Sequence, residues 1–163
     1  MNWGHMLFGF SGRINRAKWW LSVLAVVILS VLVPVLGLVL PSDTFLPLIL
    51  AVASWIITVW ISLAAGAKRL HDLNKSGGWL VIFTGGPILL VAAFIAYAGG
   101  AAGAAILAGQ APSDADLLRI GGAILIVGLI WLALLIWYLV WFGCLRGTVG
   151  ANRFGVDPLE GKI

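Results

Sequence analysis

The sequence predicts an all-α integral membrane protein, a four-transmembrane-helix bundle with both termini in the cytoplasm. Three observations support this fold class: an apolar composition, four uncharged segments of membrane-spanning length, and basic residues gathered in alternate connections. Of the 163 residues, 62% are hydrophobic and 10% are charged, whereas about a quarter of the residues in a soluble domain are charged. A globule of this size cannot bury so much apolar surface, so lipid must surround most of the chain.

The four uncharged segments lack every Asp, Glu, Lys, Arg and His, and they cover residues 19–40, 45–66, 79–97 and 121–143. Each is close to the roughly 20 residues that a helix needs to cross the hydrocarbon of a bilayer. Helices are expected because lipid offers no partner to unpaired backbone groups, and a β-barrel would show short alternating segments instead. No linker indicates a second domain, so residues 1–163 are predicted to form a single membrane domain.

The first two predicted spans are joined by the short link 41–44, with the sequence Pro-Ser-Asp-Thr. So short a connection makes the two helices antiparallel neighbours. Asp43 or Thr44 is expected to cap the second helix, since a side-chain oxygen at the cap accepts a free N–H group of the first turn.

The long connection between the third and fourth spans allows two arrangements. Either the third helix continues past Tyr97, or a short separate helix lies in the outer interface. The Gly-Gly-Pro run 85–87 could also break the third span early and shift its centre later in the sequence. Ser113 or Asp114 is predicted to cap the N-terminus of the fourth helix.

The basic residues predict the orientation of the chain. Segments 1–18, 67–78 and 144–163 hold nine of the ten Lys and Arg residues, and the two other connections hold only Arg119. Cytoplasmic loops retain Lys and Arg, so these three segments are predicted to be cytoplasmic. Aromatic anchors at the headgroup level are expected at the same ends of the spans, and these are Trp19, Trp20, Trp79 and Trp141.

The segment after the second span, RLHDLNKSGGWL, concentrates polar groups between two apolar stretches. If the second helix continues into it, Lys68 and Arg69 each lie one turn from Asp72 and favour the helix. Ser76 and the two glycines then end it. His71 beside Asp72 is the one acid–base couple in the chain that an enzyme would use. No metal site is predicted, because the sequence lacks the ligand spacing that zinc requires.

Three stretches resemble a known family: FSGRINRAKWW (residues 10–20), RLHDLNKSGGW (residues 69–79) and the glycine-rich tail from Gly147 to Pro158. Together they are similar to the small bacterial inner-membrane family catalogued as domain of unknown function 805. Relatives typically read Ser-Gly-Trp-Trp, while here Gly78 occupies the position of the first tryptophan. The resemblance implies four spans and a multi-pass location in the bacterial inner (plasma) membrane, and it implies no known catalytic activity.

All three stretches fall in the predicted cytoplasmic segments 1–18, 67–78 and 144–163, which we name the polar cap. We expect these segments to fold together, with Asp72 close to Arg13 or Arg16 and Asn152 bonded to loop backbone, because buried charges need partners. The residues predicted to form the site are Arg13, Arg16, Arg69, His71, Asp72, Ser76, Asn152, Arg153 and Asp157.

Three functions remain open at this level. The first is a non-enzymatic accessory or scaffold protein whose basic polar cap contacts anionic lipid or a protein partner. The second is a small oligomeric channel or transporter, for which Ser54, Thr58 and Ser62 would supply a polar stripe at helical spacing. The third is an enzyme acting on lipid headgroups at the cytoplasmic interface, with His71 and Asp72 as its acid–base couple.

The expected partners are membrane lipids with anionic headgroups on the cytoplasmic side. A homo-oligomer or a membrane-protein partner is also compatible with the small-residue helix faces. We expect no cofactor and no nucleic acid as a partner.

Overall fold

The computed structural model describes residues 3–40, 45–111 and 113–161. Within these ranges the chain is mainly helical and has no β-strand, and its tail after residue 144 consists of turns with one isolated β-bridge. The chain forms two compact units, residues 1–79 with 141–163, and residues 80–140. Its helices are α1 (Trp3–Phe8), α2 (Arg16–Leu38), α3 (Leu46–Asp72), the 3₁₀ turn η1 (Gly77–Trp79), α4 (Leu80–Leu107), α5 (Asp114–Leu139) and the π turn η2 (Val140–Cys144).

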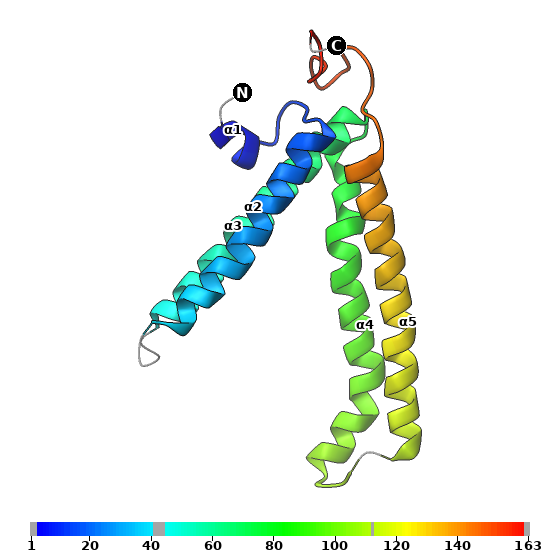
Figure 1. Ribbon diagram of the computed structural model, residues 1–163. Coiled ribbons are helices and arrows are strands. Elements are labelled where there is room, and N and C mark those ends of the chain that lie inside the picture. The colour runs from blue at the N-terminus through cyan, green and yellow to red at the C-terminus, as the bar shows by residue number, and fades with distance from the viewer. Residues whose placement is uncertain (1–2, 41–44, 112, 162–163) are drawn as a thin grey trace. The chain divides into compact units, whose positions relative to one another are not determined.

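In the first unit, α2 and α3 lie side by side as an antiparallel pair (Figure 1). Asn15 caps α2, because its side-chain oxygen accepts the backbone N–H of Lys18 at 2.9 Å. Phe45 occupies the cap position of α3 and makes no side-chain cap bond. The predicted caps Asp43 and Thr44 lie outside the described residues.

The second helix continues beyond its predicted end at residue 66, since α3 runs to Asp72. The predicted uncharged span ended two residues before Lys68, the first charged residue after it. In the structure, Lys68, Arg69 and Asp72 are all buried and bonded, so these charges extend the helix.

The second unit is a hairpin of α4 and α5, seen in green and yellow in Figure 1. The possible break at residues 85–87 does not occur, since α4 is continuous from Leu80 to Leu107 and includes Pro87. Membrane helices tolerate an internal proline. The third helix therefore continues past its predicted end at Tyr97, which was the first of the two arrangements.

The predicted cap of α5 is confirmed at Ser113. Its hydroxyl accepts the backbone N–H of Asp116 at 3.2 Å, while the Asp116 carboxylate accepts the backbone N–H of Ser113 at 3.2 Å. This reciprocal capping box satisfies two backbone donors. It begins the fourth helix seven residues before the predicted span 121–143.

The spanning helices expose their apolar side chains. In the described part of the chain, four helices are long and apolar enough to cross a membrane, and at most 17% of the residues in the most apolar stretch of each are buried within the chain. Such surfaces are stable in lipid, because the hydrocarbon keeps apolar side chains away from water. The all-α class with four membrane-length helices is confirmed. The cytoplasmic placement of both termini and the single membrane domain 1–163 remain predictions.

Candidate functional site

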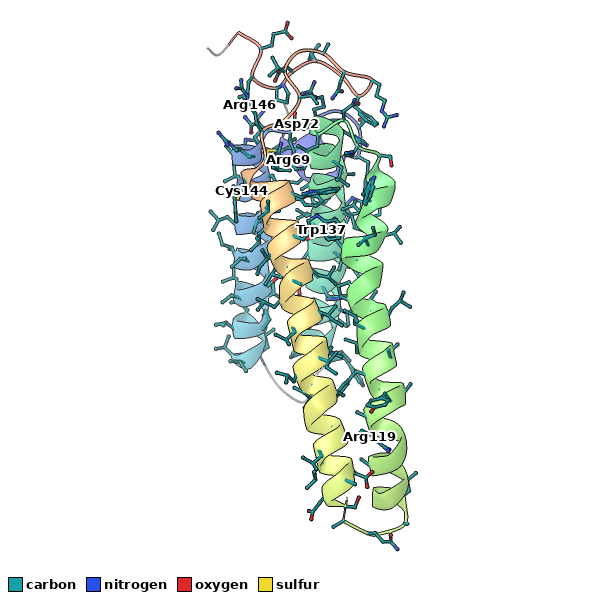
Figure 2. All side chains as sticks on the ribbon, turned by 90° about the vertical axis from the view of Figure 1, so that its right-hand side faces the viewer. Arg69, Asp72, Arg119, Trp137, Cys144 and Arg146 are labelled. Carbon is teal, nitrogen blue, oxygen red and sulfur yellow. The ribbon has the colours of Figure 1, made fainter. Side chains whose placement is uncertain are left out.

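Asp72, at the C-terminal end of α3, joins two buried arginines. One carboxylate oxygen accepts the Nε and Nη2 groups of Arg13 at 3.2 and 3.0 Å, and the other accepts Nη1 of Arg69. Asp72 is only 3% exposed, and Arg13 and Arg69 are also buried. We name these three residues the Asp72 cluster; Figure 2 shows Arg69 and Asp72 beneath the tail. The contact predicted between Asp72 and Arg13 or Arg16 is thus made by Arg13.

Arg13 also holds the C-terminal tail. Its Nη1 group donates to the carbonyls of Gly150 at 2.7 Å and Gly155 at 3.2 Å, and its Nη2 group donates to the carbonyl of Thr148 at 2.6 Å. Thr148 in turn donates its backbone N–H to the carbonyl of Asp72 at 2.8 Å. The guanidinium therefore ties the segment before α2 to α3 and to the tail.

Arg69 and Lys68 bind the open ends of two other helices. The Nε group of Arg69 donates to the carbonyl of Phe142 at 2.8 Å, and its Nη2 group donates to that of Leu145. Lys68 is fully buried, and its ammonium group donates to the carbonyls of His5 at 2.8 Å and Met6 at 2.5 Å. The last carbonyls of a helix have no partner within it, so both side chains act as caps.

The bonding partner of Lys68 differs from the prediction. Within the described residues Asp72 pairs with Arg69 and Arg13 and forms no ion pair with Lys68. The sequence places both basic residues one turn from Asp72, and nothing in that spacing indicates that the end of α1 would take Lys68 instead.

His71 and Asn152 connect the α3 end to the tail. The His71 ring stacks on Phe154, with centroids 4.0 Å apart and planes within 7°, and its Nδ1 atom lies 3.1 Å from the carbonyl oxygen of Gly12. Asn152 donates its side-chain amide to the carbonyl of His71 at 2.9 Å. This partner is the last turn of α3, and the bond to loop backbone is the one that the Asn152 side-chain oxygen accepts from the N–H of Phe154 at 2.9 Å.

The other predicted site residues lie at the edge of this network. Arg16 is exposed and donates to the carbonyl of Cys144 at 3.4 Å. Arg153 is exposed and lies over the Phe154 ring, 4.7 Å from its centroid. Ser76 contributes its backbone carbonyl, which accepts the N–H of Trp79 at 3.3 Å.

Asp157 organises the turn of the tail. Its two carboxylate oxygens accept the backbone N–H groups of Gly150 at 3.0 Å and Leu159 at 2.9 Å. The bond from Leu159, followed by that from Gly150, lowers the pKa of Asp157 below its usual value, because both donors stabilise the ionised form. Asp157 is therefore an ionised carboxylate that holds one backbone N–H group on each of its oxygens.

Gly147 allows the tail to approach Asp72. A β-carbon built at Gly147 would lie 2.5 Å from the carboxyl carbon of Asp72, which no real side chain permits. The glycine-rich pattern of the tail includes Gly147 but does not indicate this contact. The site requires glycine at position 147, because a side chain on any other residue would displace the Asp72 carboxylate.

A cavity of about 240 Å³ lies beside the Asp72 cluster. Its walls come from the start of α2, the end of α3 and the tail, and its lining residues are Asn15, Arg16, Arg69, Asp72, Arg146, Gly147, Val149, Asp157, Pro158 and Leu159. Figure 2 shows Arg146 on the same end of the first unit as Arg69 and Asp72. Arg146 is exposed and was not among the predicted site residues.

The predicted polar stripe of α3 bonds within its own helix. The hydroxyl groups of Ser54, Thr58 and Ser62 donate to the carbonyls of Ala51, Trp55 and Thr58 at 2.9, 2.9 and 2.7 Å. Thr58 is buried, and the two serines are half-buried.

Trp19 does not lie at a lipid surface as predicted. It is 1% exposed, and its ring lies 5.9 Å from that of Phe142 and 4.8 Å from that of Trp20. Trp20 is exposed and donates its indole N–H to the carbonyl of Gly143 at 3.3 Å. Trp19 therefore packs inside the first unit, and Trp20 lies at its surface.

Among the described residues, no three His, Cys, Asp or Glu side chains come close enough together to hold a metal ion. Cys144 is a free, exposed thiol.

The family model described as protein of unknown function (DUF805) matches residues 7–156. Two curated relatives are the inner membrane protein YhaI of Escherichia coli strain K12 and that of Escherichia coli O157:H7. Each is 29% identical over 158 residues, which cover 94% of this chain and 89% of the relative. No solved structure matches the chain. With its four membrane-length helices, the chain thus belongs to the family of unknown function DUF805 and is a multi-pass protein of the inner membrane.

Proposed function

We propose that this protein is a non-enzymatic accessory or scaffold protein whose basic polar cap contacts anionic lipid headgroups on the cytoplasmic side. The supporting observation is the division of the cations in the first unit. Arg13, Lys68 and Arg69 are buried and bonded within the chain, so their charges serve the fold. A second set is exposed and forms no ion pair with any described carboxylate, namely Arg16, Lys75, Arg146 and Arg153.

Exposed cations near an anionic leaflet each contribute about 1 kcal/mol of attraction. Four such charges on one compact unit therefore favour phosphatidylglycerol over a zwitterionic lipid. The attraction should weaken as salt screens it.

The alternatives have less support. The hydroxyl groups of Ser54, Thr58 and Ser62 donate to carbonyls of α3 itself, which favours a role in helix packing over a polar pathway. Both carboxylate oxygens of Asp72 accept from guanidinium groups and His71 is stacked on a ring, which favours a structural role over acid–base chemistry.

Spin-labelled lipids in proteoliposomes test the proposal. We expect a larger motionally restricted fraction for phosphatidylglycerol than for phosphatidylcholine, and a smaller difference at high salt. Lys75→Gln and Arg153→Gln should each reduce the preference, and together reduce it further. Arg119→Gln is the matched control, because Arg119 already lies 4.0 Å from Asp116 and over the Tyr97 ring. Equal restriction of the two lipids by the unaltered protein would refute the proposal.

A further inference from the structure

We propose that the cavity beside the Asp72 cluster is a binding site for one phosphate group, from a phospholipid headgroup or from a free phosphate ester. This inference rests on the proposed function and deepens it, because it assigns the anion to one site with one stoichiometry. A general electrostatic attraction would bind many lipids around the unit without selecting one.

The cavity brings together three arginines from distant parts of the chain. Arg16 comes from the first turn of α2, Arg69 from the last turn of α3, and Arg146 from the segment after η2. A guanidinium presents paired donors that match two oxygens of a phosphate. The volume of about 240 Å³ leaves room for a phosphate group among them.

The two acids that line the cavity form no ion pair with Arg16 or Arg146. Asp72 already accepts from Arg13 and Arg69, and Asp157 already accepts from two backbone N–H groups. Within the described residues no carboxylate lies within 4.0 Å of either exposed guanidinium. Two cations therefore face the cavity with donors to spare, and an anion placed there would satisfy both.

The charge balance favours an anion rather than a cation or a neutral molecule. Counting Arg13, the four arginines in and beside the cavity exceed its two aspartates by two charges. A phosphate diester or monoester would neutralise one or both of the excess charges. The start of α2, a helix of 23 residues capped by Asn15, adds the positive end of its dipole to the same wall.

The test uses the full chain in a neutral maltoside detergent. Calorimetry measures glycerol 3-phosphate, with glycerate as a carboxylate of similar size, and native mass spectrometry counts bound dihexanoyl phosphatidylglycerol. We expect one equivalent of a phosphate ligand and weak or no binding of glycerate. Arg146→Gln should lower the affinity about tenfold, because it removes a charge-assisted hydrogen-bond donor. The Arg16→Gln/Arg146→Gln double variant should lose saturable binding.

Two further variants control for folding and for charge. Arg119→Gln removes an exposed cation that does not line this cavity, so its binding should match that of the unaltered protein. Arg146→Lys keeps the charge but not the paired donors and should bind with intermediate affinity. Circular dichroism checks that each variant keeps its helical content.

The outcomes separate the ligand sources and the two proposals. Binding of both phosphate probes assigns recognition to the phosphate group, and binding of one probe assigns it to the lipid or to the soluble ester. Absence of saturable binding, or equal binding by the double variant, overturns the phosphate site. The spin-label experiment varies Lys75 and Arg153, which lie outside the cavity, so the lipid preference can survive the loss of this inference.

Discussion

Asp72 accepts hydrogen bonds from Arg13 and Arg69, and all three residues are buried. Moving charges out of water is costly, so such a cluster adds little net stability compared with an apolar replacement of similar shape. Removing one member of the cluster is strongly destabilising, because the remaining charges stay buried without a partner. The Asp72 cluster is therefore most sensitive at its carboxylate, which serves both arginines.

We predict that Asp72→Asn lowers the free energy of unfolding by about 3–5 kcal/mol, since it leaves two buried guanidinium groups uncompensated. Unfolding in mixed micelles with increasing SDS, followed by tryptophan fluorescence, measures the loss. Arg119→Gln breaks an exposed pair and should change stability by less than about 1 kcal/mol. If the two variants unfolded at the same SDS fraction, Asp72 would not hold the network together.

Gly147→Ala should cost about 1–3 kcal/mol, because the new methyl group would overlap the Asp72 carboxylate and force backbone shifts. The same SDS titration measures the change. Gly121→Ala is the matched control: nothing lies within 4 Å of the added carbon, and alanine favours a helix over glycine. A wild-type transition in Gly147→Ala would show that the tail does not pack against Asp72.

At the scale of elements, the last turn of α3 supplies caps to other helices. Lys68 binds the carbonyls at the end of α1, and Arg69 binds those of Phe142 and Leu145 at the end of η2. Positive groups are favourable at helix C-termini because of the helix dipole. The charged last turn of α3 thus caps the C-terminal ends of α1 and η2. It also forms the end of α3 itself.

The start of α5 depends on a single cap. Ser113→Ala should destabilise the first turn by about 1 kcal/mol, because the N–H of Asp116 loses its acceptor. Hydrogen exchange of the amides in this turn reports the loss of protection, and Ser113→Thr, which keeps a hydroxyl, should retain most of it. Unchanged exchange in Ser113→Ala would mean that the turn is held by other contacts.

At the scale of the whole molecule, the orientation in the membrane follows from the basic residues. The prediction is that segments 67–78 and 144–163 are cytoplasmic and that the α4–α5 connection faces outward. In a Cys144→Ser background, Ser113→Cys should react with an impermeant maleimide added to intact spheroplasts. Arg153→Cys should react only after permeabilisation. The reverse pattern would invert the topology and remove the polar cap from the cytoplasm.

Much of the fold could be predicted from the sequence, because the surrounding lipid restricts which structures can cross the membrane. Lipid requires long apolar helices with internally satisfied backbones, and this requirement shows directly in composition and length. The span ends were predicted less well, since a charge in the sequence does not reveal whether it is solvated or buried. Asp72 illustrates this, because the uncharged span was predicted to end at residue 66 and the helix ends at Asp72.

The sequence by itself determined the all-α class, the four spans and a cap at Ser113 or Asp114, and the structure placed that cap at Ser113. The tertiary structure decided which charges meet: Arg13 rather than Arg16 pairs with Asp72, and Lys68 binds the end of α1. It also placed Gly147 against the carboxylate and gathered Arg16 and Arg146 around one cavity. Apolar patterning is a local property of the chain, whereas ion pairing depends on which distant segments come within about 3 Å of each other.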